Sequence, residues 1–183
     1  MAKKATKTTK ATKATTASAA TAGSVTLTGF PPLVGKNPTT LILGEFPGEC
    51  SLYTGLYYSH WSNSLRDIIA DIFNNGIPFR KYIDFENCLK SNHIALWDVY
   101  ETRTMNGDIV IGNTPNDIAT FLKNHPTIRK IIFNGRAAEA EFNKMGIPFT
   151  GCAVYAPSTS GRNNKKGSKS YLTKLAAWKQ VLP

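Results

Sequence analysis

Two glycines flank a short loop that could bring the backbone close to a ligand. The loop Gly44-Glu45-Phe46-Pro47-Gly48 follows the apolar run Thr40–Leu43. Glycine accepts positive φ angles and lets backbone amide groups approach a base edge, a sugar or a phosphate. A purely structural turn has the same pattern. We therefore take these five loop residues as candidates for lining a binding pocket.

A second loop combines small hydroxyl residues with basic ones. It begins Pro157-Ser158-Thr159-Ser160 and continues Gly161-Arg162-Asn163-Asn164-Lys165-Lys166-Gly167. Hydroxyl groups, backbone amides and cations are the groups that contact DNA phosphates. A solvated surface loop has the same composition, so the pattern alone leaves both interpretations open.

The segments around these loops alternate apolar runs with helical patterns, which is typical of βαβ units around a parallel sheet. The predicted strands are 40–43, 93–99, 129–133 and 152–156, and the predicted helices are 63–73, 83–90, 117–124, 136–145 and 172–181. Polar or turn residues end each strand, among them Asp98 and Asn134. Ligands of open parallel sheets bind outside the carboxyl ends of the strands, so these positions are where a site is expected.

The charge of the chain favours an anionic partner. It carries 22 Lys+Arg against 12 Asp+Glu, a net charge of +10. Residues 1–22 contain five lysines and neither acids nor large apolar residues, which predicts a disordered basic tail before one folded domain over 23–183. Such a tail attracts nucleic acid through counterion release. A targeting extension, or neither role, is the alternative.

The cysteines and the apolar runs exclude other classes of protein. Cys50, Cys88 and Cys152 are too few for a disulfide framework and have no metal-knuckle spacing. No apolar run approaches the ~18 residues that a membrane helix needs. We expect no metal, no other cofactor and no membrane span.

Five segments in order along the chain resemble the uracil-DNA glycosylase superfamily, most closely its hypoxanthine-DNA (deoxyinosine) glycosylase branch. They are Leu41–Gly48 continued by Ser51-Leu52, Tyr57-Tyr58, His60 and Asn63; Ile94–Val99; Pro115–Asp117; Phe133–Ala138; and Pro157–Ser160. The resemblance implies a three-layer α/β/α sandwich with a central four-stranded, mostly parallel sheet. It also implies a monofunctional glycosylase that hydrolyses the N-glycosidic bond of a deaminated base, hypoxanthine or uracil, in DNA.

The resemblance assigns roles to the polar residues. Asn63 falls at the catalytic position, where its amide would orient water or bond the leaving base. The segment Ser158-Thr159-Ser160 would grip phosphates beside the flipped nucleotide. Arg162 or Asn163 would fill the gap in the base stack, and Lys165 would add a cation. On sequence alone, an N-cap of the following helix explains Asn63 equally well.

Aromatic and amide side chains complete the expected pocket. Phe46 could stack on the flipped base, and Tyr57 and Tyr58 could form its wall. His60 could donate a proton or bind a phosphate, and Asn134 could recognise the base edge. Aromatic core residues and a structural histidine are the alternatives for this set.

The chain departs from the branch pattern near these residues. Trp61-Ser62 stands where Pro-Arg is expected, and Leu65-Arg66 where an aromatic pair is expected. Glu45 replaces a small hydroxyl residue, and Gly161-Arg162-Asn163 stands in place of Pro-Ala-Asn. These departures leave the base specificity open.

DNA containing deaminated bases is the expected partner, bound by a monomer. The location expected is the cytoplasm, at the nucleoid, in a bacterium, and the nucleus or an organelle in a eukaryote. Two alternatives from other classes remain: a catalytically weak nucleic-acid-binding relative, and a small-molecule hydrolase on the same scaffold, because a fold does not fix a substrate.

Overall fold

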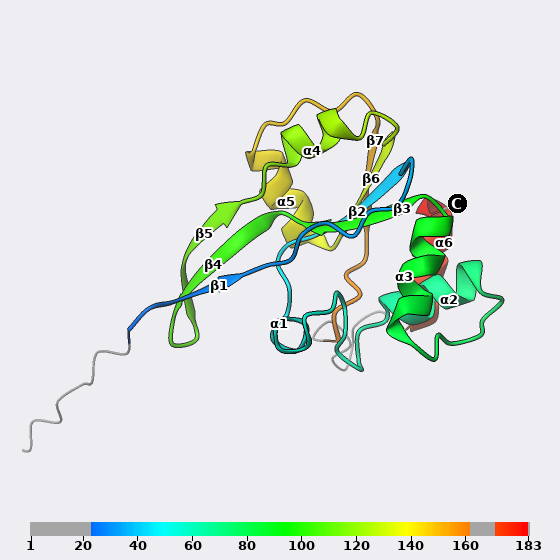
Figure 1. Ribbon diagram of the computed structural model, residues 1–183, viewed down its shortest axis with the longest axis horizontal. Coiled ribbons are helices and arrows are strands. Elements are labelled where there is room, and N and C mark those ends of the chain that lie inside the picture. Colours follow the sequence, from blue (N-terminus) through cyan, green and yellow to red (C-terminus); the bar gives the residue numbers. More distant parts are fainter. Residues whose placement is uncertain (1–22, 162–170, 183) are drawn as a thin grey trace, which may run out of the picture.

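A four-stranded parallel sheet forms the centre of the structure (Figure 1). The computed structural model describes residues 23–161 and 171–182, so the expected tail over 1–22 and positions 162–170 lie outside it. The strands are β2 (Thr40–Gly44), β3 (Ile94–Asp98), β6 (Lys130–Asn134) and β7 (Cys152–Ala156), in the order β3-β2-β6-β7. All neighbouring strands run parallel, so their carboxyl ends meet at one edge of the sheet.

Side-chain alternation along these strands divides the core into two halves. Ile42 and Ile132 pack in one half with residues of α2 (Leu65–Phe73), α3 (Tyr82–Ser91) and α6 (Tyr171–Val181). Leu41 and Leu43 pack in the other half with residues of α4 (Ile118–Asn124) and α5 (Arg136–Lys144). Because successive residues of a strand point to opposite faces, each face of the sheet gains a layer of helices. The predicted three-layer α/β/α sandwich is confirmed.

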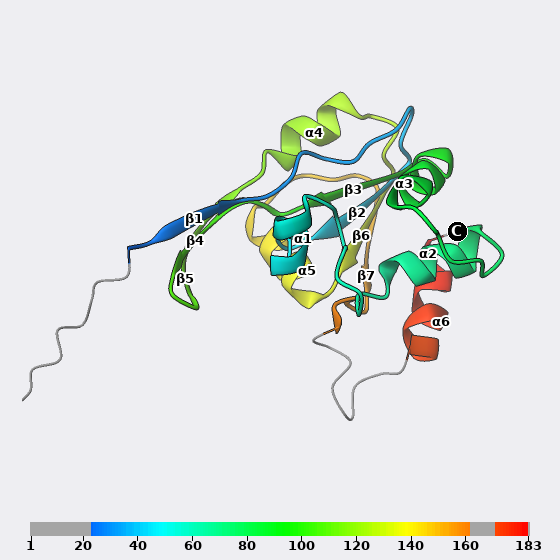
Figure 2. The same ribbon diagram turned by 60° about the horizontal axis from the view of Figure 1, so that its bottom comes forward.

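A three-stranded antiparallel sheet, absent from the sequence-based prediction, projects beside the sandwich (Figure 2). It contains β1 (Val25–Thr28), β4 (Tyr100–Asn106) and β5 (Ile109–Pro115), in the order β1-β4-β5. Its residues are exposed or half-buried, and β1 and β4 lack the continuous apolar runs of the parallel sheet. The apolar run Ile109-Val110-Ile111 of β5 is exposed. The short helix α1 (Glu49–Thr54) was also missed, since six residues are too few for a periodic pattern.

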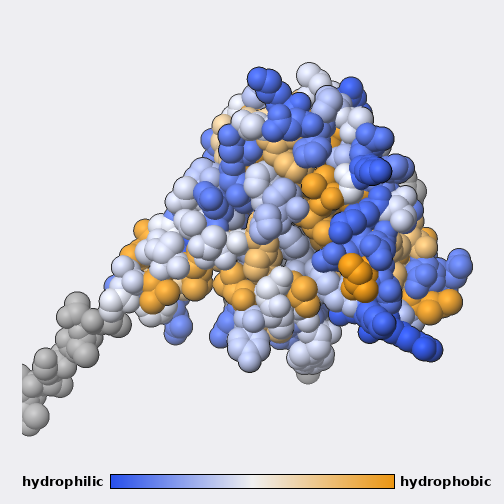
Figure 3. All heavy atoms as spheres, viewed as in Figure 1, coloured by the Kyte–Doolittle hydropathy of each residue, from blue (hydrophilic) through white to orange (hydrophobic). Residues whose placement is uncertain are grey.

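Hydrophobic and hydrophilic residues are interspersed over the face of the molecule shown in Figure 3. None of the described helices is long and apolar enough to cross a membrane. Within residues 23–161 and 171–182, no three His, Cys, Asp or Glu side chains are grouped so as to hold a metal ion.

Candidate active site

Three strand ends bring small and polar residues together at the edge of the parallel sheet. Gly44 at the end of β2 lies opposite Asp98 at the end of β3. A side-chain carbon at position 44 would overlap the Asp98 carboxylate and lie 2.9 Å from the Tyr58 hydroxyl oxygen. Position 44 is therefore restricted to glycine by these two close side chains. The sequence analysis noted Asp98 as the polar end of a strand and assigned it no role in the site.

The Asp98 carboxyl group is buried in this crowded place. Only 4% of the residue is exposed, and its Oδ2 atom has no hydrogen-bond partner among the described residues. Burial, and after it the negative charge of Glu45, raise the pKa of Asp98 to about 7 against the opposing effect of Arg103. The carboxyl group is therefore largely neutral in mildly acidic solution and can donate as well as accept a hydrogen bond.

The Tyr58 hydroxyl is a second buried polar group at the same place. The backbone of Tyr58 has a φ of 53°, in the left-handed region that residues other than glycine seldom adopt. Burial and then the neighbouring Asp98 raise the pKa of this hydroxyl far above its usual range, and the Asn134 amide opposes the rise. No described residue completes a hydrogen bond to the hydroxyl. We call Gly44, Tyr58, Asp98 and Asn134 the strand-end site.

Asn134 at the end of β6 joins this site to the second loop. Its Oδ1 accepts a hydrogen bond from the Thr159 backbone N–H, and its Nδ2 donates to Thr159 Oγ1, both at 2.9 Å. Thr159 is fully buried, and its carbonyl accepts from the backbone N–H of Ser64 at 3.0 Å. The expected phosphate contact of the Thr159 side chain is therefore not available in this arrangement. Thr159 instead connects β6 to the start of α2.

Close backbone packing fixes the rest of this loop. A side-chain carbon at Gly135, which has a φ of 105°, would lie 2.9 Å from Ser158 Cβ. A side-chain carbon at Gly161 would overlap Ser62. Ser62 and Gly161, two of the departures from the family pattern, thus contact each other. Ser158 and Ser160 are half-buried, with the Ser160 N–H donating to Ser158 Oγ at 3.3 Å. The expected DNA contacts of Arg162, Asn163 and Lys165 fall outside the described residues.

Asn63 lies two residues before α2, whose N-cap is Ser64, so the N-cap position is one residue later than the alternative expected for Asn63. Its Oδ1 accepts a hydrogen bond from the backbone N–H of Leu65, the first residue of the helix, at 3.0 Å. Its backbone N–H donates to the His60 carbonyl at 2.8 Å. Because the oxygen is engaged, the amide NH₂ is the group left to act on a ligand.

His60 and its neighbours form a surface pocket around Asn63. The backbone N–H of Ser62 donates to His60 Nδ1 at 3.2 Å, so the neutral ring carries its proton on Nε2. The pocket has a volume of about 150 Å³. We call it the outer pocket, and its lining residues are His60, Trp61, Asn63, Arg66, Asp67, Pro78 and Phe79.

Arg66 supplies the cation of the outer pocket. One of its terminal nitrogens donates to the Phe79 carbonyl at 3.3 Å. Its Nε atom is buried and has no partner in the part of the chain that the structure describes. A family pattern with an aromatic residue at this position could not have revealed this group.

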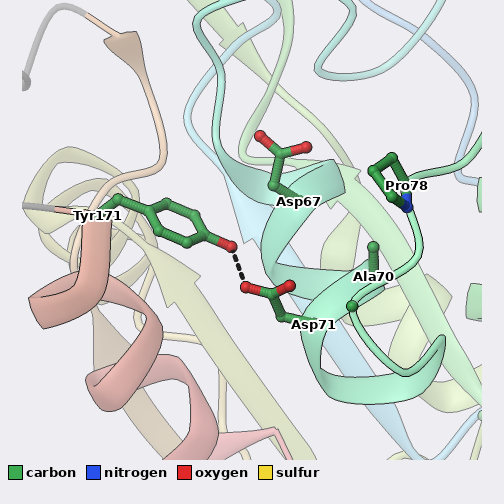
Figure 4. Close-up of a pocket in the computed structure, with 6 residues that line it drawn as sticks. Asp67, Ala70, Asp71, Pro78 and Tyr171 are labelled. Atoms are coloured by element: carbon green, nitrogen blue, oxygen red, sulfur yellow. Dashed lines mark hydrogen bonds between the residues drawn. The ribbon is translucent and has the colours of Figure 1, made fainter.

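A larger hollow, of about 270 Å³, adjoins the outer pocket and has a different character (Figure 4). Asp67 and Asp71 of α2 line it, and Tyr171 of α6 donates a hydrogen bond to Asp71 at 2.6 Å. Two carboxylates repel phosphate, so this hollow is a poor candidate for contact with DNA. The hydrogen bond between Tyr171 and Asp71 in this hollow connects α6 to α2.

The first loop packs against the antiparallel sheet. Glu45 forms an ion pair with Arg103, whose guanidinium lies 4.8 Å from the centre of the Phe46 ring. Phe46 is half-buried, Pro47 is buried, and the exposed Gly48 precedes α1. One face of Phe46 is therefore occupied by Arg103, and the carboxylate of Glu45 is paired with the same guanidinium.

Tyr57 belongs to the core. Only 7% of it is exposed, and its hydroxyl lies within hydrogen-bond distance of the carbonyls of Phe30 and Pro31, at 3.3 and 3.2 Å. The core alternative therefore holds for Tyr57, and Tyr58 is half-buried and packs against the same core cluster.

Comparisons with known proteins identify the family. The sequence model of the uracil DNA glycosylase superfamily matches residues 31–182. A hypoxanthine DNA glycosylase of Methanosarcina barkeri is 30% identical over 146 residues, covering 78% of this chain and 92% of the relative. One of Methanosarcina acetivorans is 31% identical over 141 residues, covering 75% and 88%. A solution NMR structure from M. acetivorans, of a candidate uracil DNA glycosylase, superposes with a TM-score of 0.71 at 26% identity, covering 86% of this chain and 97% of that one. The chain belongs to the uracil DNA glycosylase superfamily.

Proposed function

We propose that this protein is a monofunctional DNA glycosylase that flips a deaminated base out of the duplex and hydrolyses its N-glycosidic bond, with hypoxanthine as the preferred base. Membership of the superfamily supports a glycosylase that acts on deaminated bases in DNA. The two relatives named as hypoxanthine DNA glycosylases, at 30% and 31% identity, support the choice of base.

The observation that carries the proposal is the pair of buried polar groups at the strand-end site. A buried polar group without a partner costs about 1 to 3 kcal/mol. The chain keeps two such groups, Tyr58 and Asp98, side by side at Gly44. Deamination creates a carbonyl next to an N–H on the base edge. A neutral carboxyl group can bond both, and an adjacent phenol can bond a further polar atom.

Asn63 is the residue that we propose acts in bond cleavage. Loss of the base leaves negative charge on the base and positive charge on the sugar, so a fixed donor facing the base lowers the barrier. The Asn63 oxygen is held by the Leu65 N–H, which orients the amide NH₂. Water then attacks the sugar, and an abasic site remains.

Single-turnover reactions with duplexes that carry one deoxyinosine, deoxyuridine or deoxyxanthosine test this function. Alkali is added afterwards to cleave abasic sites. We expect alkali-dependent cleavage that is fastest for deoxyinosine. Cleavage without alkali would contradict a monofunctional enzyme, and no release from any duplex by a sample that binds DNA would contradict the glycosylase.

A further inference from the structure

Trp61 is the fully exposed tryptophan at the rim of the outer pocket. Its exposed fraction is 89%, whereas Trp97 and Trp178 are 8% and 0% exposed. An indole ring offers a large flat apolar surface, and burial of that surface against another ring is favourable. Trp61 therefore presents to solvent the kind of surface that a nucleic acid base covers well.

The Trp61 ring is held in place before any ligand binds. It stacks on His60, with ring centres 5.7 Å apart and an angle of 28° between the rings. His60 is bonded in turn through Nδ1 to Ser62, and Ser62 packs against Gly161. The Trp61 side chain therefore loses less conformational entropy when DNA binds than an unrestrained side chain would lose.

Charged groups of the pocket favour a nucleotide over a purely apolar ligand. Arg66 lines the same pocket, and its buried Nε lacks a partner among the residues that the structure places. The exposed carboxylate of Asp67 also lines the pocket, toward the neighbouring acidic hollow. A phosphate would therefore be favoured on the Arg66 side and disfavoured on the Asp67 side.

We propose that the outer pocket binds a DNA nucleotide next to the flipped one, with Trp61 stacked on its base and Arg66 facing its phosphate. This inference rests on the proposed function, because it takes DNA as the ligand. Stacking is nearly independent of base identity, since every base has a flat π face. The contact therefore adds affinity for DNA and leaves the choice of the excised base to the strand-end site.

Tryptophan fluorescence tests the stacking directly. The probe is a short duplex with one tetrahydrofuran abasic analogue, which contains no base to release. We expect this duplex to quench the emission of the native protein and to leave the emission of Trp61→Phe nearly unchanged, because the two remaining tryptophans are buried. Equal quenching of both proteins, or none at saturating DNA, would overturn the proposal.

Binding of the same duplex gives an independent test. Trp61→Ala should weaken binding by roughly ten-fold, while Trp61→Phe, which can still stack, should lose much less. Tyr53→Ala removes a ring that is 92% exposed and lies outside the pocket, so it should leave binding nearly unchanged. Equal losses for Trp61→Ala and Tyr53→Ala would contradict a role specific to this pocket. Because the abasic analogue has no base to release, this experiment tests DNA binding by the outer pocket separately from the glycosylase activity.

Discussion

The strand-end site and the outer pocket differ in how their polar groups are satisfied. At the strand-end site, Tyr58 and Asp98 are held with buried polar atoms that no described residue bonds. In the outer pocket, His60 and Asn63 are exposed and half-buried, respectively, and each is bonded to the backbone of its own loop, while Arg66 Nε is buried without a partner among the described residues.

This difference separates two kinds of binding. Buried groups without partners destabilise the free protein and gain strongly from a ligand that bonds them, so they suit recognition of one base. Exposed aromatic and charged groups cost little to keep and bind any DNA that covers them. Thr159 links the two regions, because it bonds both Asn134 of the strand-end site and Ser64, next to Asn63.

The largest expected effect comes from Asn63. Asn63→Ala should lower the single-turnover rate of base release by about 100-fold and leave DNA binding nearly intact, because the amide acts in the transition state. Asn63→Asp is the matched control, since its oxygen can still accept from the Leu65 N–H while the NH₂ donor is lost. We expect both variants to lose rate and the Ala variant alone to lose about 1 kcal/mol of stability. A rate retained by Asn63→Asp would refute the donor role.

Ionisation of Asp98 should make base release depend on pH. If the neutral carboxyl bonds the base, the rate falls by about ten-fold per pH unit above the pKa, which is about 7. Asp98→Asn keeps a donor and an acceptor but does not titrate, so its rate should stay level across the same range. The measurement is the single-turnover rate between about pH 5 and pH 9. If the rate falls equally with pH in the native protein and in Asp98→Asn, a group other than Asp98 causes the fall.

Asp98 should also link pH to stability. Its pKa is 3.8 in ordinary surroundings and about 7 in the fold, so between these values unfolding releases a proton. The free energy of unfolding therefore falls as the pH rises through this window, by on the order of a few kcal/mol, and is level above it. Urea unfolding should find that Asp98→Asn becomes increasingly more stable than the native protein across the window. A constant difference would contradict the raised pKa.

Thr159→Val should destabilise the protein by about 1 kcal/mol, because the half-buried Asn134 NH₂ loses its hydrogen-bond partner. Thermal unfolding measures this loss. Ser160→Ala is a control in the same loop, and its effect should be smaller because Ser160 is half-buried. An equal loss of stability in the two variants would show that the contact between Asn134 and Thr159 contributes no more than the Ser160 hydroxyl does.

Glu45→Gln should have the smallest effect. It removes a negative charge that raises the pKa of Asp98 and breaks the ion pair with Arg103. The midpoint of the fall in rate should therefore move to lower pH, with stability changed by less than about 1 kcal/mol. Movement to higher pH would contradict the electrostatic account of Asp98.

The sequence predicts the parallel sandwich well because its strands are buried on both faces and appear as continuous apolar runs. The antiparallel sheet is not predicted from the sequence, because strands such as β5 (Ile109–Pro115) have little buried surface. Within the site, the strand-end rule locates Gly44 and Asn134. It does not reveal that Asn134 bonds Thr159, because that contact joins residues 25 positions apart and depends on the shape of a loop. The role of Tyr58 depends on its left-handed backbone, which no local pattern marks.

The most direct test of the division between the two regions compares Asp98→Leu with Trp61→Ala. For each variant, single-turnover release of hypoxanthine at saturating enzyme and affinity for an abasic-analogue duplex are measured together. The account predicts that Asp98→Leu lowers the saturating rate and keeps the affinity, whereas Trp61→Ala lowers the affinity and keeps the saturating rate. If both variants change the same quantity, the strand-end site and the outer pocket do not have separate roles.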